Sequence, residues 1–198
     1  MSSTTGFTSN FSHSYSVVLQ HPISDVFPIL GTAKGHEQVC RLSSLCSNFE
    51  LFEPDHVQLE HGGNYLGETN VRSKAPADND EAPASEFRKI LPRQPFTMTE
   101  SVPLLFGMYK ANIVLNGTLT WDSEFHTTLY ETESNSGVKV WKLRTFEEVA
   151  ARDVNGGNAT LVSERIEGVC PRYLKIIVQK ETSKGHIAHM DAYHTLFE

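Results

Sequence analysis

Three side chains in this sequence carry groups that could act on a small molecule: His126, Tyr109 and Tyr193. The imidazole of His126 would titrate near neutral pH, so it could move a proton at an enolisable carbon. The phenol of either tyrosine could donate a hydrogen bond to a carbonyl oxygen and stabilise the charge that develops there. These three residues are the candidate catalytic set. The alternative is structural, with a hydrogen-bonded strand histidine and tyrosines that are simply packed.

Strand-like segments surround His126 and carry further candidates. Side chains two residues apart on a strand share a face, so His126 and Tyr130 lie together, with Trp121 just before them. On the next segment, Lys142 and Arg144 lie opposite to Trp141. Both faces are mixed, so periodicity does not decide which one points inward. Substrate contacts are expected from these strands, the segment before them and the C-terminal helix: Trp121, Tyr130, Trp141, Arg144, Phe106, His189 and Met190.

Four charged strand residues could line a cavity or lie on the surface: Glu131, Arg144, Glu164 and Arg165. A carboxylate that points inward needs a partner, because an unpaired buried charge costs several kcal/mol. Ion pairs across neighbouring strands on the surface are the preferred interpretation.

Metal and cofactor motifs are weak or absent. His186, His189 and His194 lie beside Asp191, but the histidines are three and five residues apart, whereas helical ligand pairs usually lie four apart. The sequence has no Walker loop, no dinucleotide-binding glycine pattern and no Gly-x-Ser-x-Gly elbow. The three cysteines form no metal or disulfide signature, and Cys40 and Cys46 are interpreted as core thiols. We therefore expect no metal and no cofactor.

Length and charge limit the classes of partner. A chain of 198 residues suits one domain, and its net charge of −7 argues against nucleic acid or anionic membrane as a main partner. The longest apolar run, Val102 to Met108, is too short to span a bilayer. The first 20 residues lack Lys and Arg and contain no signal-peptide core. A cytoplasmic protein without membrane insertion is expected.

The order of elements is strand, short helices, strands and one closing helix. Residues 1–12 are expected to be a flexible arm, and Tyr15, Val17 and Leu19 alternate as in a first strand. Helical turns are expected from Ile23 to about Leu45. The acidic, proline-bearing stretch 73–86 fits a solvated surface loop, or a lid over a pocket.

Later strands are separated by short polar turns, which favour antiparallel neighbours. Turns are expected at Asn116-Gly117, at 134–137 and at 155–158, between the strands Met108–Leu115, Thr118–Glu131, Val138–Val149 and Ala159–Val169. Pro171 suits the first turn of the closing helix, and Gly185 is expected to weaken or bend it.

This layout resembles the START-like superfamily, which includes birch-pollen-allergen-like proteins, polyketide cyclase/dehydrases and lipid-transport domains (SRPBCC). The resemblance covers residues 13–198 and depends on element order, on His21 to Phe27, and on the junction Val169-Cys170-Pro171. It implies an α+β helix-grip fold, in which a curved seven-stranded antiparallel sheet wraps around the C-terminal helix. The cavity between them usually holds a hydrophobic small molecule. An insert near 72–95 and the arm 1–12 depart from that pattern.

The resulting hypothesis is a cofactor-independent enzyme of the cyclase, lyase or isomerase type. It would fold a polyketide- or terpenoid-like substrate inside the cavity and promote cyclisation, dehydration or a related rearrangement. The alternative is a non-catalytic carrier or sensor of a hydrophobic small molecule, and a protein-interaction domain is a third hypothesis. The oligomeric state stays open, with a homodimer as one alternative.

Overall fold

One antiparallel sheet dominates the computed structural model, which describes residues 8–60, 65–67, 71–77, 88–104, 109–151 and 158–198. Its neighbours run in the order β1-β8-β7-β6-β5-β4-β2, with β3 also paired to β4. The fold is α+β, as predicted. The strands are β1 (Phe11–Leu19), β2 (Cys46–Leu51), β3 (Asp55–Glu60), β4 (Arg88–Leu104), β5 (Tyr109–Asp122), β6 (Thr127–Ser134), β7 (Lys139–Ala150) and β8 (Asn158–Val169).

The meander from β4 to β8 is confirmed, but one of its turns was misplaced. Asn116 and Gly117 lie inside β5, and the turn into β6 follows Asp122 instead. A Cβ atom on Gly117 would lie 2.5 Å from the ring of Phe96, so this glycine lets an aromatic ring approach the strand. Gly137 does occupy a turn, with a φ of 80° that favours glycine.

The strand at the sheet's edge is broken in two. Leu51 at the end of β2 pairs with Phe96, and Asp55 at the start of β3 pairs with Arg93 on the same strand, β4. Pro54 lies between them and has no N–H to donate, so the ladder is interrupted there. This break gives eight strands where seven were expected. Residues 88–95 of the expected insert are paired strand within β4.

The expected helical insert follows β1. It consists of α1 (Ile23–Leu30), the 3₁₀ turn η1 (Ala33–Gly35) and α2 (His36–Arg41), and α1 contacts β7 and β8. Val26, Phe27 and Leu30 are buried on its inner side. Another 3₁₀ turn, η2 (Tyr65–Gly67), follows β3.

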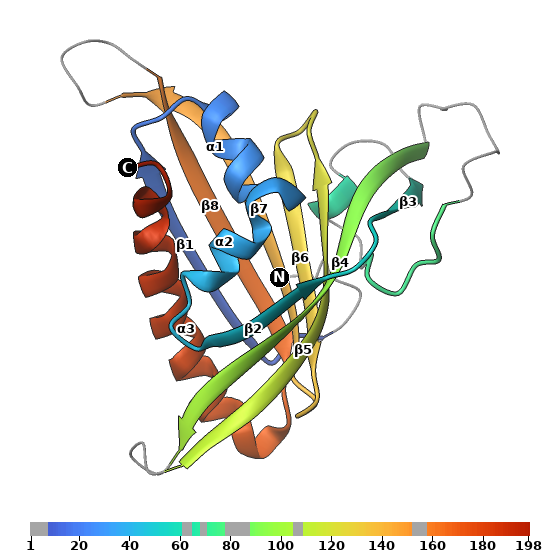
Figure 1. Ribbon diagram of the computed structural model, residues 1–198, viewed down its shortest axis with the longest axis vertical. Helices are drawn as coiled ribbons and strands as arrows, with labels where there is room; N and C mark the ends of the chain where they lie inside the picture. The colour runs from blue at the N-terminus through green and yellow to red at the C-terminus, as the bar shows by residue number, and fades with distance from the viewer. Residues whose placement is uncertain (1–7, 61–64, 68–70, 78–87, 105–108, 152–157) are drawn as a thin grey trace.

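The closing helix lies along β1 (Figure 1). It consists of the 3₁₀ turn η4 (Arg172–Leu174), α3 (Lys175–Asp191) and the 3₁₀ turn η5 (Ala192–Leu196). The hydrogen-bonded helix continues through Gly185. None of the described helices is long and apolar enough to cross a membrane.

Side chains are packed on both faces of the sheet. The inner core contacts the helices and includes Leu19, Val26, Phe27, Leu30, Val39, Phe146, Val162, Met190 and Tyr193. The outer core lies on the opposite face, under β3 and η2, and consists of Val57, Leu59, Leu66, Val71, Leu91, Leu129, Trp141 and Leu143. Phe11 is 3% exposed, and the side chain of Asn10 bonds to the backbone of Cys170, so the expected arm is ordered from these residues onward.

We predict that Gly185→Ala stabilises the protein by about 0.5–1 kcal/mol, because alanine loses less backbone freedom than glycine in a helix and a new Cβ at this position meets nothing within 4 Å. The matched control is Gly168→Ala, whose Cβ would lie 2.1 Å from the ring of Phe11 and must destabilise. Urea denaturation measures both variants. A destabilised Gly185→Ala variant would contradict the interpretation of an open helical position.

Candidate functional site: a buried ionic cluster

Strand register brings the charged residues of the inner face together. Arg144 on β7 pairs with Glu164 on β8 and with Thr128 on β6. Paired residues project from the same face of a sheet, so these side chains point together toward the helices. Lys142 and Tyr130 form the adjacent pair two residues along on the same face.

Glu164 is the centre of this cluster. Its Oε1 accepts hydrogen bonds from Arg144 Nε and from the Tyr193 hydroxyl, each at 2.5 Å. Its Oε2 lies 2.9 Å from His186 Nε2 and 3.5 Å from Lys142 Nζ. The residue is 2% exposed. One buried carboxylate therefore connects two strands with the closing helix.

Arg144 extends the cluster to the first helix. Its Nη2 donates to the Tyr193 hydroxyl at 2.6 Å, and its Nη1 donates to the carbonyl oxygen of Leu30 at the end of α1. Cations are favourable at this end of a helix, because the last carbonyl groups carry partial negative charge. Thr128 donates to the carbonyl of Gly31 at 2.6 Å. The end of α1 is thus held by two inward-facing strand residues.

The cluster's electrostatics favour an ionised Glu164. Burial alone would raise the pKa of this carboxyl, but the positive charges of Arg144 and Lys142 hold the pKa well below its usual range. Burial raises the pKa of Tyr193 well above its ordinary value, so its phenol stays protonated and acts as a donor. Burial also lowers the pKa of Lys142, against the opposing attraction of Glu164.

Lys142 has more N–H donors than hydrogen-bond partners. An ammonium has three N–H donors. Among the contacts of the described residues, Nζ has one carboxylate oxygen of Glu164 at 3.5 Å and the Tyr130 ring, whose centroid lies 4.6 Å away. The side chain is 13% exposed. Two cations thus face one carboxylate at close range, and the amine retains capacity to bind another oxygen.

Two histidines connect Glu164 with β1. His13 Nδ1 lies 2.8 Å from His186 Nδ1, while His186 Nε2 bonds to Glu164. Burial, and then the charge of His186, lower the pKa of His13. A separate histidine, His189, donates from Nε2 to the carbonyl of Val39 at 2.8 Å. Burial lowers the pKa of His189 to about 4, so it is neutral at pH 7.

An aromatic group adjoins Tyr130 on the inner face. His36 is 3% exposed and packs against the rings of Phe49, Phe96 and Tyr130. Burial lowers the pKa of His36 to about 3. Cys40 Sγ lies 3.8 Å from His36 Nδ1, and burial raises the pKa of this thiol to about 12. The thiol is therefore protonated and a poor nucleophile, in agreement with its interpretation as a core cysteine.

The structure brings some of the sequence candidates together and separates others. Arg144, Tyr193, Tyr130, His189 and Met190 all face the interior at or beside the cluster. Trp121 packs against the inner core from β5, in the row that contains Thr128 and Arg144.

His126 and Trp141 lie away from the Glu164 cluster. His126 lies in the turn before β6 with a φ of 46°, and its ring packs edge-on against Phe27. Trp141 belongs to the outer core, on the opposite face from Arg144, with the guanidinium of Arg165 5.1 Å from its ring. Tyr109 begins β5, opposite Leu104. Phe106 lies outside the described residues.

Sequence reasoning missed Lys142 as a site residue, and it considered Glu164 and His186 without including them among the expected site residues. The preferred interpretation of Arg144 and Glu164 was a surface ion pair across strands. The pairing is confirmed, but the pair is buried, so its surface location was wrong. A usable signal was the Lys142-x-Arg144 spacing, which places two cations on one strand face opposite a tryptophan and a leucine. No group of three metal-binding side chains occurs among the described residues.

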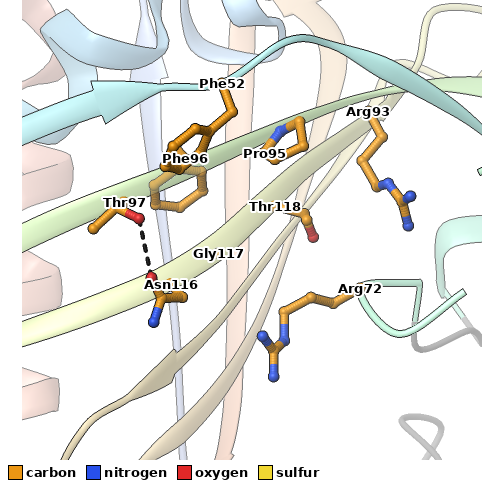
Figure 2. Close-up of a pocket in the computed structure, with 9 residues that line it drawn as sticks. All are labelled: Phe52, Arg72, Arg93, Pro95, Phe96, Thr97, Asn116, Gly117 and Thr118. Atoms are coloured by element: carbon orange, nitrogen blue, oxygen red, sulfur yellow. Dashed lines mark hydrogen bonds between the residues drawn. The ribbon is translucent and has the colours of Figure 1, made fainter.

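A hollow lies on the outer face of β4 and β5 (Figure 2). It has a volume of about 330 Å³, and its lining residues are Phe52, Arg72, Arg93, Pro95, Phe96, Thr97, Asn116, Gly117 and Thr118. Arg93 forms a bidentate ion pair with Asp55, and Arg72 pairs with Glu133. Because both guanidinium groups already face carboxylates, the hollow has less excess charge to offer a ligand than the inner cluster has.

Comparison with known proteins identifies the fold. No protein-family model matches the chain. No curated protein matches it either. Among solved structures, the protein TTHA0849 from Thermus thermophilus matches with a TM-score of 0.51 at 11% identity, over 93% of this chain and 94% of that one. Truncated norcoclaurine synthase from Thalictrum flavum matches with a TM-score of 0.50 at 11% identity, over 94% and 92%.

The chain has the START-like fold. The likeness covers almost the whole chain, and at 11% identity it concerns the fold alone. The START-like fold and the helix-grip arrangement predicted from sequence are thereby confirmed. In this START-like fold, the Glu164 cluster lies between the sheet and the closing helix, where the resemblance to the superfamily implied a ligand cavity.

We predict that Glu164→Gln destabilises the protein by about 3–5 kcal/mol, because Arg144 and Lys142 would remain buried without their counter-charge. Glu147→Gln is the matched control, since Glu147 is exposed on the neighbouring strand and its loss should change the free energy of unfolding by less than about 0.5 kcal/mol. Chemical denaturation at pH 7 measures both. Equal effects would mean that the cluster is no more sensitive than the surface.

A second prediction concerns pH. Since the pKa of His36 is about 3 when folded and 6.5 is its ordinary value, the unfolded chain binds more protons between these limits. Stability therefore falls as the pH drops through this window, by up to about 1.4 kcal/mol per pH unit from this group. His36→Phe should remove that part of the slope. Phe49→Leu, which perturbs the same aromatic group without a titrating side chain, should shift stability without changing the slope. An unchanged slope in His36→Phe would refute the assignment.

Proposed function

We propose that this protein is a cofactor-independent enzyme of small-molecule metabolism. It binds a hydrophobic, polyketide- or terpenoid-like substrate between the inner face of the sheet and α3, and promotes cyclisation, dehydration or a related rearrangement. The observation that supports this proposal best is the buried set of proton donors and acceptors around Glu164. Preorganised polar groups in a site of low dielectric constant stabilise developing charge far better than water does.

Apolar side chains beside the cluster support a hydrophobic substrate. Phe96 and Met98 on β4 are buried on the inner face, and Leu115 pairs with Met98. Further along the same face, Ile113 and Val102 are only half-buried. This surface, which is apolar except for Glu100 between Met98 and Val102, continues from the polar cluster toward the far ends of β4 and β5. A ligand with one polar end and an apolar body would match a polar cluster that is followed by such a surface.

Lys142 and Tyr193 are the groups best placed to act on a substrate oxygen. Lys142 has donors beyond its contact with Glu164, so its amine could bind a carbonyl oxygen or a developing enolate. Its lowered pKa also suits proton transfer. Tyr193 donates to Glu164, and a substrate oxygen would have to compete with that carboxylate. His126 and Tyr109 remain proposed contributors to proton transfer and carbonyl polarisation.

A carrier or sensor of a hydrophobic small molecule is the alternative. In its favour, Glu164, Arg144 and Tyr193 satisfy one another, so the cluster could stabilise the fold without touching a reacting atom. The name of norcoclaurine synthase describes an enzyme with this fold, which shows that the architecture can support catalysis. Neither role needs a membrane-spanning segment or nucleic acid.

Native mass spectrometry of the freshly purified protein comes first, because a co-purifying hydrophobic compound would serve as substrate and ligand in the next test. With that compound, we predict that Lys142→Met lowers turnover by about 100-fold or more while its dissociation constant changes by only a few-fold. Lys139→Met, on the same strand but half exposed, is the control and should retain turnover.

One result would decide against the enzyme, and another against the proposed role of Lys142. Tight binding without any conversion of the compound by the wild-type protein would favour the carrier. Full turnover by a folded Lys142→Met variant would exclude Lys142 from the mechanism. Circular dichroism of each variant separates loss of function from loss of fold.

A further inference from the structure

The closing helix exposes several of its large apolar residues to solvent. On its buried side, polar residues accompany Met190: Gln179 bonds to the backbone of Ser12, His186 to Glu164, and His189 to Val39 in α2. Near its beginning, apolar residues face solvent: Tyr173 in η4 is 81% exposed, Ile176 84% and Ile177 61%. A surface helix normally places its apolar side against the core. These exposed apolar residues therefore lack the cover that such residues usually have.

These exposed residues form one continuous stripe. At 100° per residue, the spacing of three and four positions places them on the same side of the helix. We call this the α3 stripe: Tyr173, Ile176, Ile177, Lys180, Lys184 and Ile187. It is about 20 Å long at 1.5 Å per residue. Single exposed apolar residues are ordinary, whereas a contiguous row indicates an interaction surface.

The charge around the α3 stripe differs from that of the whole chain. Residues 171–187 contain four cations, Arg172, Lys175, Lys180 and Lys184, and one carboxylate, Glu181. The chain as a whole carries −7. At physiological salt, charges more than about 8 Å away are largely screened, so a partner at the α3 stripe meets the local positive charge.

We propose that the α3 stripe docks on the surface of a membrane that contains anionic phospholipids. The isoleucines and Tyr173 would lie at the boundary between headgroups and acyl chains, while the lysines reach the phosphates. A second copy of the chain fits less well, because a two-fold contact through this stripe would bring Lys180 and Lys184 of both copies together. This surface lies on the solvent side of α3, so the proposal is independent of the proposed function.

The proposal refines the expectation drawn from composition. A net negative charge disfavours anionic membranes as a main partner, but it averages over the whole surface. Docking requires only one face of suitable chemistry. It also requires no spanning segment, because an interfacial helix lies in the plane of the membrane. Binding through a few side chains would be weak, reversible and sensitive to salt.

The test is flotation of the full-length protein with vesicles of phosphatidylcholine, with and without phosphatidylserine. We expect binding to the anionic vesicles only, and a fall in binding with added salt. Ile176→Ser/Ile177→Ser should lower the partition coefficient by about tenfold. Ile90→Ser is the matched control, since Ile90 is 49% exposed on β4, far from the α3 stripe in sequence, and it should bind as the wild type does.

A second pair of variants tests the charge. Lys180→Gln/Lys184→Gln should weaken binding to anionic vesicles, while Lys34→Gln, at an exposed lysine outside α3, should not. The proposal fails if neither vesicle type binds the protein, if neutral and anionic vesicles bind equally, or if the control variants lose as much binding as the stripe variants. It also fails if sedimentation shows a dimer that the double isoleucine variant dissociates, since the occupant would then be a second copy.

Discussion

A carboxylate buried inside the sheet imposes the main physical constraint on this protein. Glu164 can remain ionised there only because Arg144, Lys142, His186 and Tyr193 surround it. These partners come from β7, from α3 and from the turn after it, and Arg144 also holds the end of α1. Charge compensation thereby fixes the relative positions of elements that lie far apart in the sequence. Packing alone would allow the closing helix to slide, whereas hydrogen bonds to one carboxylate define its register.

This constraint also explains the composition of α3. A helix that faces a buried charge must present polar side chains to it, so the usual amphipathic arrangement is not available. Gln179, His186 and His189 all find partners on the sheet side. Ile176 and Ile177 are left on the outside, whereas Met190 is buried. The polar contacts inside and the exposed α3 stripe thus both follow from the need to compensate the charge of Glu164.

Sequence patterns were sufficient for the order of elements and for the fold. Alternation and turn residues located most strands, although Gly117 showed that an Asn-Gly pair can lie within a strand when an aromatic ring needs the space. They could not assign the inner face, because both faces of β7 are buried. Trp141 and Leu143 lie in the outer core while Lys142 and Arg144 point inward, the opposite of a simple hydrophobic-in rule. The outer core depends on β3 and η2, and no local sequence pattern indicates that they pack together on the outer face.

The outer core has a consequence for the way the molecule can move. Its eight residues come from β3, η2, the segment after it, and the strands β4, β6 and β7, and none belongs to α3. The sheet therefore has an apolar packing layer of its own that does not require the closing helix. We expect α3 to exchange its amide hydrogens through partial openings, at lower free energy than the strands, which open only on global unfolding. Local opening of α3 would give a small molecule access to the interior while the sheet keeps its shape.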